Sequence, residues 1–181
     1  MFRRSRLRAC DRSTVTAATL CLIACVFVVG PAAALDCSAI ILDKGGLLSF
    51  GQAQLGDPRS RLPADATAAR DCAQTCSYTD SAGVTYVVRG DEIIAKEISD
   101  VSRYRGALPA RITATETLPI ILTRLATFSE GAPIWSLNPL PGGGLLLRTD
   151  NCIEGRNGVR GSYGFTFDQD GRLSAVSAEI L

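Results

Sequence analysis

The stretch from Tyr78 to Ile98 most constrains the fold of this 181-residue chain. It contains three short runs rich in β-branched and aromatic residues, separated by Asp80-Ser81-Ala82-Gly83 and by Arg89-Gly90-Asp91-Glu92. Such runs, with Gly, Asp and Ser at the corners, are typical of a small antiparallel meander. Tyr163 to Ile180 has a similar pattern at the end of the chain. We therefore expect two antiparallel units.

The first 34 residues have the pattern of a bacterial signal peptide, which predicts a periplasmic or secreted protein. Basic residues come first, an apolar run at 19–30 follows, and Ala32-Ala33-Ala34 supplies small residues before a cleavage site, which we place after Ala34. Two alternatives remain open. An uncleaved anchor is disfavoured because the apolar run is shorter than the ~20 residues of a membrane span. A lipid on Cys25 is disfavoured because the apolar run continues beyond that residue.

Charge argues against nucleic acid as a partner of the mature chain, residues 35–181. The leader contains five of the 19 basic residues and one of the 18 acidic residues, so the mature chain has a net charge of −3. A protein that binds the phosphate backbone needs a basic surface. After cleavage we also expect no stable membrane span.

Four cysteines remain after cleavage, namely Cys37, Cys72, Cys76 and Cys152. An even number in an oxidising compartment predicts two disulfides, with three possible connectivities. A Cys72–Cys76 bond would pin the turn into the first meander, and Cys37–Cys152 would then tie the N-terminus to the second half. The other two pairings remain open. We expect no metal site, because the chain has no His and the Cys spacing is wider than that of zinc pairs, and we expect no cofactor.

Helical segments are expected before each meander. Asp57 fits an N-cap and Pro58 the first helical position, although Pro63 keeps that helix short. The Ala-rich segment Asp65 to Ala73 is predicted to be helical. Leu118 to Phe128 gives the strongest helix signal, with an apolar stripe at helical spacing that we expect to pack on a sheet.

The predicted fold class is α+β, with two unequal helix-plus-antiparallel-meander units after the signal peptide. We place the first α+β unit at 35–104 and the second at 105–181. Gly106-Ala107-Leu108 matches Gly45-Gly46-Leu47 at a shift of 61 residues, and the same shift places Pro119 on Pro58. These few matches leave a tandem duplication as an open possibility.

Leu55-Gly56-Asp57-Pro58, the meander at 78–98 and the partial restart at Gly106 resemble small bacterial envelope modules. Two such families are the β-lactamase-inhibitor-protein type, a tandem of helix-plus-meander units with disulfides, and the lipoprotein of the outer-membrane barrel-assembly machinery. The resemblance covers the mature chain in outline and transfers no individual residue. It implies that the chain holds another envelope protein on a sheet face.

Catalysis has little support in the sequence. Without His, catalytic triads, Cys–His pairs and His bases are excluded, and we assign no catalytic residue. Lys96 alternates within a predicted strand, which favours a solvent-exposed face. Paired carboxylates of a small envelope hydrolase remain an alternative, with four candidates by elimination: Glu116, Glu130, Asp150 and Glu154.

The polar, Gly-rich segment from Asp150 to Gly161 is the best candidate for a binding loop, because Cys152 would anchor it. Its candidate binding residues are Asp150, Asn151, Glu154, Arg156, Asn157 and Arg160. Trp135, the only Trp, is a further candidate, as an interface anchor. The simpler interpretations are a solvated connection for the loop and core packing for Trp135. The sequence thus favours a disulfide-stabilised binding module for another envelope protein, possibly an inhibitor or immunity-type protein, with a structural envelope component as a second alternative.

Overall fold

The structure is a computed structural model of the chain, and it describes residues 40–43, 46–69, 72, 74–130, 134–149, 151–155 and 157–180. These residues all belong to one compact unit, Ala34–Leu181, which is described here by itself. None of the helices in these ranges is long and apolar enough to cross a membrane. The predicted leader, Cys25 and Cys37 lie outside the described residues.

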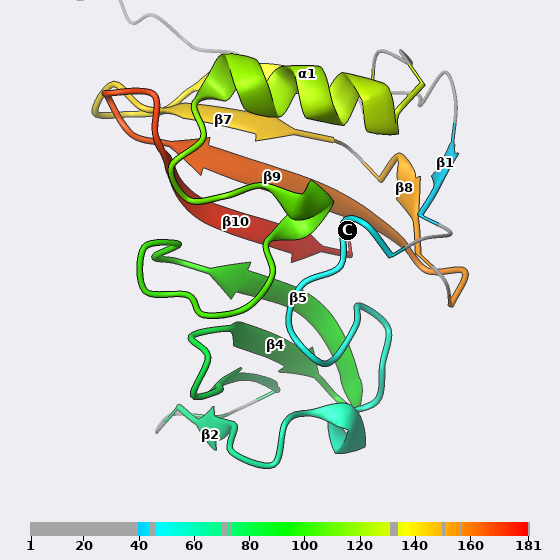
Figure 1. The fold of residues 1–181 in the computed structure, drawn as a ribbon. Coiled ribbons are helices and arrows are strands. Elements are labelled where there is room, and N and C mark those ends of the chain that lie inside the picture. Colours follow the sequence, from blue (N-terminus) through cyan, green and yellow to red (C-terminus); the bar gives the residue numbers. More distant parts are fainter. Residues whose placement is uncertain are drawn as a thin grey trace, which may run out of the picture. The chain divides into compact units, whose positions relative to one another are not determined.

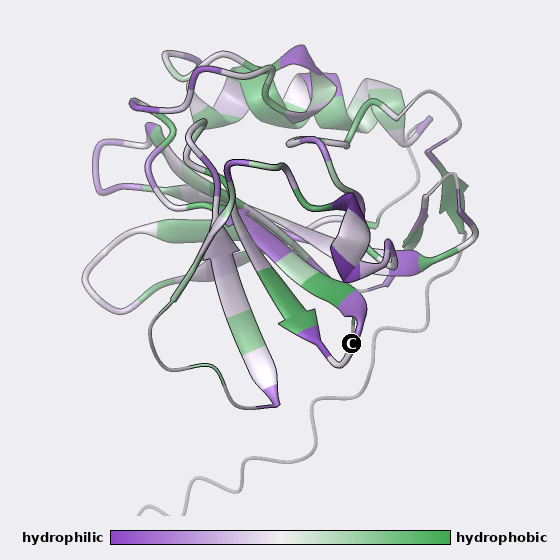
Figure 2. Ribbon diagram, turned by 90° about the horizontal axis from the view of Figure 1, so that it is seen from below, coloured by the Kyte–Doolittle hydropathy of each residue, from purple (hydrophilic) through white to green (hydrophobic). Residues whose placement is uncertain are grey.

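The first meander forms as the sequence predicts. Its strands are β2 (Thr67–Ala68), β3 (Thr75–Thr79), β4 (Thr85–Arg89) and β5 (Glu92–Ile98), each antiparallel to the next. Gly83 and Gly90, at the two corners, both have a positive φ, which glycine adopts without steric cost. Polar and apolar residues alternate along these strands, as the changing colour along the ribbons in Figure 2 shows. The alternation gives the meander one covered face and one open face.

The second meander continues the same sheet. Its strands are β6 (Ser136–Pro139), β7 (Leu145–Arg148), β9 (Arg160–Phe167) and β10 (Leu173–Glu179). The last strands of the two meanders, β5 and β10, pair with each other through Ile98 and Val176 at one end. Eight antiparallel strands therefore run in the order β6-β7-β9-β10-β5-β4-β3-β2 (Figure 1).

Two short strands complete a mixed sheet of ten strands. β8 (Ile153–Glu154) pairs with the beginning of β9, and β1 (Ile41–Leu42) pairs with β8 in parallel. β7 and β8 thus share one edge of β9, with β7 along its second half. β8 lies inside the segment that the sequence analysis treats as a loop.

The helix α1 (Leu118–Phe128) has the bounds predicted from its apolar stripe. Thr117 precedes it in extended conformation, and Pro119 lies in the first turn, where its missing N–H leaves no bond unmade. Ile121 and Leu125 are fully buried in the same core as Leu147 and Phe165 of the sheet. Figure 1 shows α1 beside β7 on one face of the sheet.

The predicted fold class is wrong, because the structure is mostly β. Within the described ranges it has a single α-helix beside ten strands, and the first half has no α-helix. Pro58 and Pro63 leave too few residues between them for a stable helix, so Arg59–Arg61 forms only a 3-10 turn, η1. The expected helix at Asp65–Ala73 is replaced, in its described part, by the edge strand β2.

An irregular segment at 46–57 covers the first meander in place of a helix. We call it the irregular cover. Its apolar residues Leu48, Phe50, Ala53 and Leu55 are buried in the same core as α1. The core is therefore continuous across both meanders, and the two halves share one sheet.

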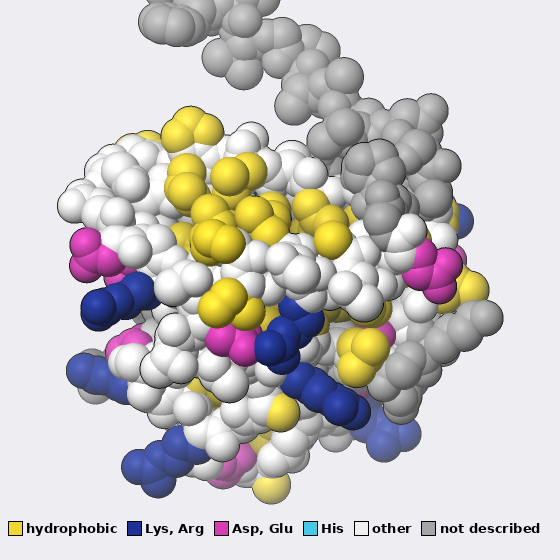
Figure 3. Space-filling view, turned by 45° about the horizontal axis from the view of Figure 1, so that its top comes forward, with side chains coloured by type: hydrophobic (Ala, Val, Ile, Leu, Met, Phe, Trp, Pro, Cys, Tyr) yellow, Lys and Arg dark blue, Asp and Glu magenta, His cyan; other side chains and the backbone are white. Residues whose placement is uncertain are grey.

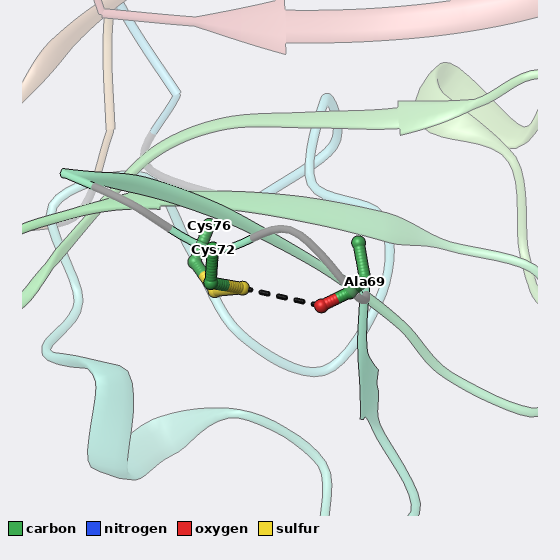
Figure 4. Close-up of a disulfide and its surroundings, with 3 residues drawn as sticks. All are labelled: Ala69, Cys72 and Cys76. Carbon is green, nitrogen blue, oxygen red and sulfur yellow. Dashed lines mark hydrogen bonds between the residues drawn. A yellow bond between two sulfur atoms is a disulfide. The ribbon is translucent and has the colours of Figure 1, made fainter.

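Among the pairings that the sequence leaves open, the structure has Cys72 bonded to Cys76 beside β3, with their Cα atoms 4.7 Å apart (Figure 4). The sulfur of Cys72 also contacts the carbonyl oxygen of Ala69 at 3.3 Å. Cys152 is buried and disulfide-bonded as well, and its expected partner Cys37 lies outside the described residues.

Candidate functional site

The described residues of the predicted binding loop make contacts within the protein itself. Asn151 has a left-handed backbone, with φ 48°, and its N–H donates to Ser162 Oγ at 2.9 Å. Glu154 and Arg160 lie on paired strands and form an ion pair at 3.4 Å, so they neutralise each other. The remaining two charged candidates, Asp150 and Arg156, lie outside the described residues.

Asn157 joins this loop to the irregular cover. Its side-chain amide donates to the carbonyl oxygen of Leu55 at 2.6 Å and accepts the N–H of Val159 at 3.2 Å. Trp135 lies elsewhere: it is half-buried against Phe165, with the ring centroids 5.9 Å apart. Asn157 and Trp135 thus contact different parts of the described structure.

A cavity of about 370 Å³ lies where the loop meets the irregular cover. We call it the Tyr163 pocket. Its walls come from two separate parts of the chain, and its lining residues are Gly46, Ser49, Gln54, Leu55, Asp57, Gly155, Asn157, Val159 and Tyr163. Of these residues, the sequence indicates only Asn157 as a binding candidate.

Lys96 anchors the irregular cover from the sheet below, and the expectation of a solvent-exposed Lys96 is wrong. The residue is 1% exposed, and its ammonium donates to the carbonyl oxygens of Phe50 and Ala53 at 2.6 and 3.1 Å. A third bond, at 3.2 Å, reaches the side-chain oxygen of Gln54 in the pocket wall. Burial lowers the pKa of Lys96 to about 8, and the charges of Asp57 and Asp43 partly offset this effect.

Two further buried polar groups shape the pocket region. Asp43 is 2% exposed, and its carboxylate accepts the N–H groups of Leu47 and Leu48 at 2.7 and 3.1 Å. Burial, together with the negative charge of Asp43, raises the pKa of Tyr163 to about 12. Tyr163 therefore keeps its hydroxyl proton at any physiological pH.

The outward side of α1 is unusually apolar for a surface helix. Only Thr123, Arg124 and Thr127 among its eleven residues are polar. Ile120 is 51% exposed, and Pro119 and Ala126 are also exposed. Figure 3 shows apolar side chains gathered over this helix. Contiguous exposed apolar surface of this kind marks interaction sites in soluble proteins.

A groove of about 680 Å³ begins at the C-terminal half of α1. We call it the α1 groove. It is lined by Leu42, Asp43, Leu47, Ala110, Arg111, Arg124, Thr127, Phe128 and Glu130. Leu42 and Leu47 are 47% and 43% exposed, although both are large and apolar. Two of the four exposed large hydrophobic side chains in the described ranges thus lie in this groove.

The backbone around the α1 groove is strained. Ala110 and Arg111, in the 3-10 turn η2 (Pro109–Arg111), have φ values of 52° and 55°, and Glu130 has a φ of 52°. Each left-handed non-glycine residue costs about 1–3 kcal/mol, and such residues gather at binding sites. Three of the four that the described residues contain line this one groove.

Some charged side chains of the α1 groove form ion pairs with their neighbours and others do not. Arg124 pairs with Glu116 and also donates to the carbonyl oxygen of Arg111 at 2.6 Å, so its charge is occupied. Arg111 is exposed, and within the described ranges its guanidinium forms no ion pair. Glu130 is likewise exposed and without an ion pair there.

The open face of the sheet has a different character. It mixes small polar residues, such as Thr85, Ser177 and Thr166, with half-buried apolar ones, namely Val87, Ala95 and Leu146. Arg148 there pairs with Glu179 at 2.8 Å. Aromatic residues, which dominate the energetic centres of protein interfaces, are missing from this face in the described strands.

The described carboxylates that the hydrolase alternative would use have different partners and do not pair with one another. Glu116 pairs with Arg124, Glu154 pairs with Arg160, and Glu130 lines the α1 groove. Among the described residues, no group of three or more His, Cys, Asp or Glu side chains could hold a metal ion.

Comparison with protein-family models, curated proteins and solved structures finds no match to this chain. The resemblance to envelope binding modules therefore stays a prediction.

Proposed function

We propose that this chain is a binding module of the bacterial envelope, and that it holds a partner protein in the α1 groove and on the adjoining outer side of α1. The observation that carries this proposal is the exposure of Leu42 and Leu47 in a groove whose backbone is strained at three residues. The disulfide between Cys72 and Cys76 supports an oxidising compartment.

The partner's chemistry follows from the groove. Leu42, Leu47 and Phe128 offer an apolar floor, and burying one large side chain there contributes about 1.5–3 kcal/mol. The exposed guanidinium of Arg111 matches a carboxylate on the partner. We therefore expect a protein segment with an apolar anchor residue beside an acidic one.

The α1 groove is a better docking surface than the open sheet face. The sheet face mixes small polar side chains with half-buried apolar ones, and its central charges, Arg148 and Glu179, already pair with each other. A partner there would have to displace that ion pair and would gain little apolar burial. This departs from the sheet-face location that the resemblance to envelope modules implies.

Site-specific photo-crosslinking in the producing cells tests the proposal. A photoreactive amino acid is placed at Leu47 or Thr127 in the α1 groove and, as matched controls, at Thr85 or Ser177 on the open sheet face. We expect one discrete protein adduct from the groove positions and none from the controls. Arg111→Glu should weaken this adduct strongly, whereas Arg103→Glu, outside the groove, should not.

Three outcomes contradict the proposal. Equal adducts from both faces would show no preferred surface. A groove adduct with a second copy of this chain would make the groove a dimer interface. Unchanged crosslinking in the Arg111→Glu variant would remove the expected acidic contact.

A further inference from the structure

A second site, separate from the α1 groove, lies in the Tyr163 pocket. At about 370 Å³ this cavity falls within the usual range of small-molecule sites. Two regions far apart in sequence form its walls: the irregular cover, and the turn after β8 together with the strand β9 that follows it.

Tyr163 is the most informative residue of the pocket. It is 5% exposed, yet no hydrogen bond to its hydroxyl exists among the described residues. Its hydroxyl is not among the fully buried polar atoms that lack a hydrogen-bond partner, so it is open to the cavity. A tyrosine that lines a cavity and lacks an internal partner can offer its hydroxyl to whatever fills the cavity.

The other walls add both donors and acceptors. One oxygen of the Asp57 carboxylate accepts the N–H of Gln54 at 2.7 Å, which leaves its second oxygen without a bond from the described residues. The side-chain oxygen of Gln54 accepts from Lys96, so its NH₂ group remains to donate. The Ser49 hydroxyl also lines the cavity and makes no described bond.

Charged side chains lie in and near this wall. Asp57 is the one charged side chain among the described residues that line the cavity. The carboxylates of Asp43 and Asp57 face the buried ammonium of Lys96, and both raise its pKa against the effect of burial. Lys96 offsets part of this negative charge, and the other described groups that line the cavity are neutral.

We propose that the Tyr163 pocket binds a small neutral molecule rich in hydroxyl groups, of the saccharide class. Each sugar hydroxyl both donates and accepts, and so fits a wall that mixes the Tyr163 and Ser49 hydroxyls, the Gln54 amide and the Asp57 carboxylate. The protein would thus bind a partner protein at the α1 groove and a saccharide at the pocket.

NMR titration of the purified, isotope-labelled protein tests this assignment. The probes are glucose, N-acetylglucosamine and maltose, with ethanolamine as a cationic control and inorganic phosphate as an anionic control. We expect at least one saccharide, and neither control, to shift the amide signals of Ser49, Leu55 and Gly155. Tyr163→Phe should weaken that binding about threefold to tenfold, because it removes one hydrogen bond.

Tyr78→Phe is the matched control, because Tyr78 is also a buried tyrosine of the sheet and does not line this pocket. Its saccharide affinity should equal that of the unchanged protein. The assignment is overturned if no saccharide shifts these amides, if only ethanolamine or phosphate does, or if Tyr163→Phe binds as tightly as the unchanged protein. None of these results bears on crosslinking at the α1 groove, so the two proposals fail independently.

Discussion

The two halves of the sheet are covered in different ways, by α1 over the second meander and by the irregular cover over the first. α1 satisfies its own backbone through helical hydrogen bonds and needs only apolar contacts from the sheet, through Ile121 and Leu125. The irregular cover at 46–57 lacks a regular hydrogen-bonding pattern of its own. Its buried carbonyl and N–H groups must find partners elsewhere.

Side chains of the sheet and the loops supply those partners. Lys96 donates to two carbonyl oxygens of the cover, and the hydroxyl of Tyr86 accepts the N–H of Gln52 at 3.1 Å. Asn157 donates to the carbonyl oxygen of Leu55. Polar residues buried under the irregular segment thus replace the hydrogen bonds that a helix makes internally. The same segment then has room for a pocket.

The largest loss of stability is expected from Leu125→Ala, which removes a fully buried contact between α1 and the sheet. Leu125 is fully buried, so the substitution leaves a cavity and should lower the free energy of unfolding by about 3 kcal/mol. Urea denaturation measures this loss. Ala126→Ser, on the exposed side of the same helix, should change stability by less than about 0.5 kcal/mol. A loss below about 1 kcal/mol for Leu125→Ala would contradict the packing of α1 on the sheet.

Lys96→Met should destabilise the protein by about 2 kcal/mol at neutral pH, because the carbonyl oxygens of Phe50 and Ala53 lose their donor while buried. The loss is reduced because the buried charge also disappears. Glu97→Gln is the control, since Glu97 is an exposed neighbour on the opposite face. A more stable Lys96→Met variant would show that Lys96 is not an anchor.

Stability should rise with pH on the alkaline side of neutrality. The folded pKa of Lys96, about 8, is below its unfolded value of 10.5, so the unfolded chain binds more protons between these values. The free energy of unfolding should therefore increase by about 2 kcal/mol from about pH 7 to about pH 9.5. Above about pH 10 the tyrosines reverse the trend, because the pKa values of Tyr86 and Tyr163 are raised to about 12 in the folded state. Lys96→Met should show no such rise, and a rise that persists in the variant would assign it to another group.

The smallest loss of stability is expected from removing the disulfide at the edge of the sheet, outside α1 and the irregular cover. Replacing Cys72 and Cys76 together by Ser should cost about 2 kcal/mol or less, because the bond closes a loop between residues only four apart. Thermal unfolding measures the change, and the same scan with reductant on the unchanged protein separates this bond from the one at Cys152. A loss above about 3 kcal/mol would mean that the bond supports the core.

Local patterns predicted the parts of the fold that depend on neighbouring residues. α1 has its predicted bounds because its apolar stripe lies within eleven residues, and the first meander follows from turn residues at its corners. The Ala-rich composition of the segment before β3 favours a helix, but pairing of Thr67 and Ala68 with β3 overrides that local preference.

The candidate sites depend on distant parts of the chain and were largely missed. Lys96 has an ordinary alternating position in a strand, and nothing nearby in sequence indicates that residues 50–54 lie above it. Tyr163 and Asp57 meet in the pocket across more than a hundred residues, and Leu47 meets Phe128 in the α1 groove. Asn157 was predicted because its polar, Gly-rich surroundings indicate a loop.

Hydrogen exchange of individual amides in the unchanged protein and in Lys96→Met tests the central claim most directly. We expect the variant to exchange faster at Gln52, Gly56 and neighbouring amides of the irregular cover. The amides of α1 should exchange only as much faster as the lower global stability of the variant requires. Equal acceleration in both covers, or none in the irregular cover, would contradict the claim that buried polar side chains hold one cover and apolar packing holds the other.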